Sequence, residues 1–180
     1  MSIDTQARPT GEPVVGTRMT GRSRTIAEAD LVGFAGLTGD WHPQHVDSEW
    51  AGASMFGERV AHGMAILSYS IGLIDFDPER VVALRGLDGV RFKRPVPIGE
   101  TISVEAVVRE VREIDADLAL VGFGWTVRTA AGETAIKASV QVLWRRDESE
   151  PPDETEADPD PDMERTEEGD YLLYPGGLLL

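Results

Sequence analysis

The chain has 180 residues, of which 41% are hydrophobic and 27% are charged, and these values are typical of one globular domain with its own core. It contains no cysteine, so disulfides, thiolate metal sites and a cysteine nucleophile are excluded. Most of the net charge of -15 comes from residues 147–170, which hold 13 acids and one base. Such an acidic segment repels nucleic acid, and we expect no nucleic-acid partner.

The first half of the chain predicts two main helices. Residues 1–15 are predicted to be flexible, and the first helix is predicted over about residues 26–36, with Thr25 as its N-cap. A short helical patch is predicted at residues 48–54. Residues 63–74 are apolar nearly all round, which predicts a helix that is buried on most of its sides.

Four segments of the second half alternate apolar and polar residues and are rich in Val and Ile, which predicts strands. They are residues 81–92, 100–113, 118–130 and 134–146. The turn signals between them indicate an antiparallel meander. A buried helix combined with antiparallel strands predicts an α+β fold, with the sheet wrapped around the helix, over residues 16–146.

The two ends of the chain indicate where the protein is found and what it contacts. The N-terminus is polar and has no apolar run typical of a secretory signal, and no apolar run is long enough to cross a bilayer, so we expect a cytoplasmic protein without membrane contact. Residues 147–170 are predicted to be a disordered acidic linker. Residues 171–180, YLLYPGGLLL, either fold back onto their own domain or dimer, or dock into a protein partner.

The segment GDWHPQHVD, residues 39–47, holds two of the three histidines. Asp40 and His45 are five residues apart, and Pro43 is expected to prevent a regular helix between them. A loop can therefore direct both side chains toward one small volume, where a carboxylate and an imidazole can hold one water and move its protons. The alternative is that Asp40 is a turn residue and His45 a loop histidine with satisfied hydrogen bonds.

A metal site is a further alternative for these histidines, and its candidate ligands are His42, His45, Asp47 and His62. The first two flank Pro43, so their rings need not share a face. We predict neither a metal nor a cofactor, because nothing else in the sequence indicates a nicotinamide, flavin or phosphate-loop site.

Gly63 opens the apolar helix, so its backbone N–H is free and lies at the positive end of the helix dipole. Glycine also lets a ligand approach the backbone closely. The sequence therefore predicts that Gly63 stabilises a negative charge on a bound substrate. The cations Arg91, Lys93 and Arg94 are candidate phosphate ligands at a strand end, and the alternative for each is a solvated strand face.

These features together resemble the MaoC-like (R)-specific enoyl-CoA hydratases and dehydratases, which have the hot-dog fold. Their pattern G-D-x-N-P-x-H-x-D, followed later by H-G-M, is matched here by Gly39, Asp40, Pro43, His45, Asp47, His62, Gly63 and Met64. The later PVPIGETI resembles their P-V-x-x-G-D-T segment. Two positions differ: His42 replaces the usual Asn, and Ile71, with Ser68 and Ser70 beside it, stands where some hydratases carry a serine.

The resemblance implies reversible syn hydration of a trans-2-enoyl thioester, carried by coenzyme A or an acyl carrier protein, to the (3R)-3-hydroxyacyl thioester. Asp40 and His45 share the water, and the Gly63 N–H stabilises the enolate. His62 is expected to close the loop or to orient Asp47, and His62 and Ser68 are expected at the substrate site. A sheet of this kind leaves edge strands that pair or pack in a dimer, so we expect a homodimer with the active sites at its interface.

Two alternatives to a general hydratase stay open. One is a dehydratase that acts in trans in a polyketide or specialised pathway and is tethered by its C-terminal tail. The other is a noncatalytic hot-dog protein that binds acyl thioesters or a partner, against which the Asp40 and His45 pair argues. A thioesterase of the same fold is disfavoured, because these enzymes usually place an acidic residue on the central helix and residues 63–74 contain none.

Overall fold

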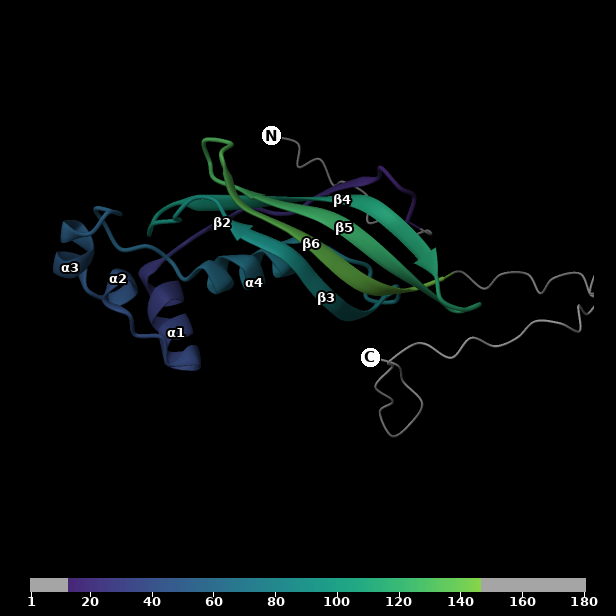
Figure 1. Cartoon of the computed structure of the whole chain (residues 1–180), viewed down its shortest axis with the longest axis horizontal. Helices are drawn as coiled ribbons and strands as arrows, with labels where there is room; N and C mark the ends of the chain where they lie inside the picture. Colours follow the sequence, from purple (N-terminus) through teal and green to yellow (C-terminus); the bar gives the residue numbers. More distant parts are fainter. Residues whose placement is uncertain (1–12, 147–180) are drawn as a thin grey trace, which may run out of the picture.

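The structure of the chain, a computed structural model, describes residues 13–146 (Figure 1). The acidic linker, the apolar C-terminal segment and most of the N-terminal segment expected to be flexible lie outside the described residues. In chain order the elements are β1 (Arg18–Thr20), β2 (Arg24–Thr25), α1 (Glu28–Thr38), α2 (Pro43–Val46), α3 (Ser48–Ala53), α4 (Gly63–Leu73), β3 (Val81–Phe92), β4 (Thr101–Glu113), β5 (Leu118–Arg128) and β6 (Thr134–Arg145).

The sheet has the strand order β1-β4-β5-β6-β3, every pair is antiparallel, and β2 also pairs with β4. The four long strands match their predicted positions closely, but the predicted meander is correct only for β4, β5 and β6. Strand β3 pairs with β6 rather than with β4. The connection at residues 93–100 contains Pro95 and Pro97 and does not form a tight hairpin. It carries the chain from β3, at one edge of the sheet, to β4, near the opposite edge.

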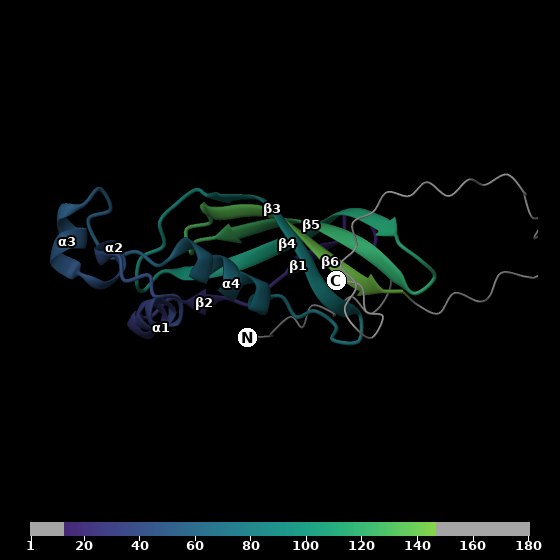
Figure 2. The ribbon, with the colours of Figure 1, turned by 60° about the horizontal axis from the view of Figure 1, so that its bottom comes forward.

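Helix α4 lies against one face of the curved sheet, whereas α1, α2 and α3 gather at one end of it (Figures 1 and 2). The predicted α+β arrangement of a central helix and an antiparallel sheet is therefore confirmed. Ile66 and Leu67 are buried in the core together with Phe123, and the indole N–H of Trp125 donates to the hydroxyl of Ser70 at 2.8 Å. One stripe of α4 stays exposed in this chain, at Met64, Ser68 and Gly72.

Helix α1 begins two residues later than predicted, and the predicted N-cap is wrong. The hydroxyl of Thr25 lies 2.8 Å from that of Thr101, because Thr25 belongs to β2 and pairs with β4. The carboxylate of Asp30 instead accepts the N–H of Ala27 at 2.7 Å at the start of the helix. The helix ends at Gly39, whose φ of 77° is in the left-handed region that favours glycine, and this turn directs the chain toward Asp40.

None of the helices in residues 13–146 has the length and apolar character needed to span a membrane.

Candidate active site

The segment after α1 folds into a short helix that carries His45. Pro43 was expected to prevent a helix here, but it is the first residue of the four-residue helix α2. At that position the missing N–H of proline costs no hydrogen bond, and its fixed φ suits the helix. His42 precedes it as N-cap, and its Nδ1 accepts the N–H of Gln44 at 3.3 Å. His42 thus supports the turn that positions His45.

His45 is buried, with only 4% of its surface exposed, and both of its ring nitrogens have partners. Nδ1 lies 2.6 Å from the carbonyl oxygen of Val60. A carbonyl only accepts, so Nδ1 carries the proton and Nε2 presents a lone pair, which accepts the side-chain amide of Gln44 at 3.0 Å. Burial is the main cause that lowers the pKa of His45; the Val60 hydrogen bond opposes it and His62 adds to it. His45 is therefore neutral near pH 7, with Nε2 as its basic atom.

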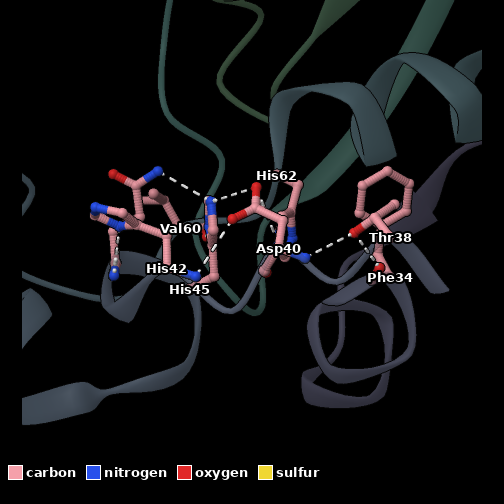
Figure 3. A network of polar contacts seen from close by, with 8 residues as sticks. Phe34, Thr38, Asp40, His42, His45, Val60 and His62 are labelled. Atoms are coloured by element: carbon pink, nitrogen blue, oxygen red, sulfur yellow. Dashed lines mark hydrogen bonds and ion pairs between the residues drawn. The ribbon is translucent and has the colours of Figure 1, made fainter. Parts of the chain in front are cut away.

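The carboxylate of Asp40 faces the ring of His45 (Figure 3). Its Oδ2 lies 4.0 Å from Nε2 of His45, while its Oδ1 accepts the N–H of His42 at 3.3 Å. A distance of 4.0 Å is too long for a direct hydrogen bond, but one water about 2.8 Å from each atom can bridge two atoms at this separation. The structure thus brings together the carboxylate and the imidazole that the sequence singled out.

His62 closes the loop onto Asp40 and does not orient Asp47. Its Nε2 donates to the backbone carbonyl of Asp40 at 2.9 Å, and its ring stacks on His45 with centroids 3.7 Å apart. The carboxylate of Asp47 has a different role, since it accepts the N–H groups of Glu49 and Trp50 and caps α3. Of the two roles expected for His62, the structure thus agrees with closure of the loop and not with orientation of Asp47, because the stacked ring directs its donor at the backbone carbonyl of Asp40.

The four metal ligands considered from the sequence do not form one set. His42 and Asp47 cap α2 and α3, whereas Asp40, His45 and His62 have one candidate ligand atom each within 4.8 Å of one another. Both imidazoles already use Nε2, toward the Gln44 amide and toward the Asp40 carbonyl. A metal or a water can reach Nε2 of His45 only when the Gln44 amide leaves it, and the absence of a metal stays a prediction.

A cleft of about 860 Å³ opens beside this network. Its lining is largely apolar and includes Phe34, Phe56, Met64 and Phe92, and its polar members include Asp40, Gln44 and His45. Gly63 lies in the same wall, and no group in residues 13–146 accepts its N–H. A Cβ added to Gly63 would lie 2.7 Å from the ring of Phe92, so a side chain at this position would collide with the neighbouring wall.

Three of the five residues predicted to bind substrate line the cleft: His62, Lys93 and Arg94. Arg91 is not among the lining residues, and its guanidinium donates to the carbonyl of Val90 at 2.9 Å. Ser68 is also outside the lining, and its hydroxyl donates to the carbonyl of Met64 within α4 at 2.8 Å. Of the three cations predicted to contact phosphate, Lys93 and Arg94 thus line the cleft and Arg91 does not, and phosphate binding itself stays a prediction.

Sequence reasoning missed two partners of His45. Gln44 contacts Nε2, and its position directly before His45 in the quoted segment was the available signal. Val60 contributes only its backbone carbonyl, which depends on the path of the chain and not on the type of side chain. The tautomer of His45 is fixed by this second partner.

The family model described as MaoC like domain matches residues 10–127. The chain belongs to the MaoC-like domain family. The match includes α1, the Asp40 and His45 network, and the first residue of α4. The arrangement of one central helix and an antiparallel sheet is thus the hot-dog fold that the resemblance implied.

Individual MaoC-like relatives agree with this assignment. The chain is 45% identical over 82 residues to Protein MaoC of Klebsiella aerogenes, a match that covers 45% of this chain and only 24% of that protein. It is 30% identical over 121 residues to the (R)-specific enoyl-CoA hydratase of Rhodospirillum rubrum, covering 67% of this chain and 81% of the relative. The solved R-hydratase PhaJ1 of Pseudomonas aeruginosa superposes with a TM-score of 0.63 at 29% identity, covering 76% of this chain and 84% of that one.

Proposed function

We propose that this MaoC-like protein catalyses the reversible hydration of a trans-2-enoyl thioester to the (3R)-3-hydroxyacyl thioester. The observation that carries the proposal is the pair of Asp40 Oδ2 and His45 Nε2, 4.0 Å apart beside an apolar cleft that also contains Gly63. The names of the relatives from Rhodospirillum rubrum and Pseudomonas aeruginosa, both hydratases, support the same reaction.

In the proposed mechanism, one water displaces the Gln44 amide from Nε2 of His45 and is bound by Asp40 and His45 from two sides. Nε2 of His45 removes a proton from the water as its oxygen bonds to C3, and the electrons of the C2=C3 bond move toward the thioester carbonyl. The Gly63 N–H, at the start of α4, stabilises the negative charge that develops on the thioester oxygen. The imidazolium then returns the proton to C2, so that hydrogen and hydroxyl add from the same face and His45 is again neutral.

Turnover of crotonyl-CoA tests the proposal directly. We expect the absorbance of the conjugated enoyl thioester to fall when the full-length protein is added, and the product to be the (3R)-3-hydroxybutyryl thioester by chiral chromatography. The crotonyl thioester of an acyl carrier protein is assayed in parallel, because either carrier is compatible with the proposal. Absence of turnover with both carriers, or an S product, would contradict it.

We further propose that the protein is a homodimer, as expected from the edge strands of its sheet, and that β3 contributes to the interface. Strand β3 pairs only with β6 among the described strands, and its side chains Leu84 and Leu87 are exposed. Exposed apolar side chains on an edge strand favour pairing with another chain. Light scattering is expected to give twice the mass of one chain, and Leu84→Asp together with Leu87→Asp is expected to shift the protein toward monomer. A monomeric wild-type protein at micromolar concentration would refute the proposal.

A further inference from the structure

The turn between β5 and β6 places an acid on one of the two cations that line the cleft. The carboxylate of Glu133 lies 2.6 Å from the guanidinium of Arg94, and both side chains are about half exposed. The neighbouring cation Lys93 also lines the cleft, and no acidic side chain in residues 13–146 pairs with it. The two cations and Glu133 therefore leave one net positive charge at this wall of the cleft.

The backbone of the turn holds Glu133 in place. Its N–H donates to the hydroxyl of Thr129 at 3.2 Å, and its carbonyl accepts the N–H of Thr129 at 2.9 Å. Thr129 itself is buried, and the φ of 79° at Gly132 lets the chain reverse between the two. On the opposite side, the N–H of Lys93 donates to the carbonyl of Ala135 at 2.7 Å. Main-chain contacts thus hold the backbones of the turn and of the Lys93 segment, from which the acid and the cations project.

We propose that Glu133 is a specificity-determining residue that competes with the phosphates of the thioester carrier for Arg94. The inference rests on the proposed function, because it concerns the thioester that enters this cleft. A phosphate that approaches Lys93 and Arg94 must share the Arg94 guanidinium with the Glu133 carboxylate or displace that carboxylate, and it is also repelled by the negative charge of Glu133. A thioester of pantetheine, which carries no phosphate, meets neither cost. Glu133 therefore weakens the binding of highly charged carriers selectively.

The test compares wild type and Glu133→Gln with crotonyl-CoA and with crotonyl-pantetheine. At low ionic strength we expect Glu133→Gln to lower the KM for crotonyl-CoA by roughly threefold to tenfold, in line with the modest strength of exposed charge interactions. The KM for crotonyl-pantetheine is expected to stay within about twofold, since no phosphate is present. The gain with crotonyl-CoA is expected to shrink in high salt and to vanish in an Arg94→Gln background.

A matched control separates the effect of a charge beside Arg94 from the effect of the net charge of the protein. Glu105→Gln removes the same charge from another exposed ion pair, that with Arg18 at 3.1 Å, and Glu105 does not line the cleft. We expect this variant to behave like wild type with both substrates. If Glu105→Gln and Glu133→Gln lower the KM equally, or if Glu133→Gln acts equally on the phosphate-free thioester, the proposed competition at Arg94 is refuted.

Calorimetric titration with free coenzyme A and with pantetheine separates this inference from the proposed reaction. A tighter Kd for coenzyme A in Glu133→Gln, with no turnover by either protein, would support the role of Glu133 and contradict the hydratase function. Turnover by wild type with an unchanged Kd and KM in Glu133→Gln would support the hydratase function and overturn the inference. Failure of wild type and variant alike to bind coenzyme A would also overturn it.

Discussion

Asp40→Asn is expected to reduce kcat for crotonyl-CoA hydration by about 10²–10⁴-fold, the range typical for loss of general acid–base catalysis. The amide keeps the shape of the carboxylate, but it lacks the negative charge that would hold the water against His45 and offset the imidazolium that forms during the reaction. The side chain of Asp40 is 53% exposed, so the change should leave the free energy of unfolding nearly unaltered. Initial rates and thermal unfolding of the same preparations check both expectations.

Asp47→Asn is the matched control for this prediction. It makes the same chemical change seven residues further along the chain, at a carboxylate that caps α3 and does not line the cleft. Asparagine is also a good N-cap, so we expect this variant to keep the wild-type rate within about twofold. If Asp40→Asn retains most of its activity, the proposed sharing of a water between Asp40 and His45 is wrong.

His45→Ala is expected to reduce kcat to a similar extent, but it also lowers the free energy of unfolding, which Asp40→Asn does not. The imidazole is buried, and its removal leaves the Val60 carbonyl without its donor. An unsatisfied buried acceptor costs about 1–3 kcal/mol of unfolding free energy. A fall in activity is therefore interpreted for His45→Ala only at temperatures where unfolding curves show that the variant is folded.

The elements that follow a simple periodicity could be predicted from the sequence. Helix α4 and strand β4 bury regular sets of apolar residues, so the spacing of these residues indicated both structure and position. The pairing of β3 with β6, at one edge of the sheet, depends on the path of the connection at residues 93–100. No local sequence pattern contains that information. Strands β1 and β2 are three and two residues long, which is too short for a periodic signal.

The candidate site shows the same division between side-chain chemistry and chain path. Asp40 and His45 could be chosen because a carboxylate and an imidazole near each other have an obvious shared chemistry. The stacking of His62 on His45 could not be predicted, because it depends on how the segment before α4 folds back over α2. The contact between Arg94 and Glu133 joins residues that are far apart in the sequence, and only the turn between β5 and β6 brings them together.

Gly63→Ala is expected to lower kcat/KM by about 10²-fold, comparable with the loss of one oxyanion donor. Alanine keeps the N–H, so the effect must come from the methyl group, which would lie 2.7 Å from the ring of Phe92. Gly72→Ala is the matched control in the same helix, because no atom lies within 4 Å of its added Cβ. That control is expected to keep the wild-type rate and to stabilise α4 by about 0.5–1 kcal/mol.

The combination of Gly63→Ala with Phe92→Ala distinguishes two ways in which the methyl group could act. If the methyl only pushes the Phe92 ring into the cleft, removal of that ring restores the rate. If the methyl instead keeps the thioester oxygen away from the Gly63 N–H, the double variant remains slow, because the N–H is still covered when the ring is gone. We expect the second result, since the proposed charge stabilisation needs the backbone itself to be accessible. Full recovery in the double variant would assign Gly63 a packing role, and a wild-type rate in Gly63→Ala would remove it from the mechanism.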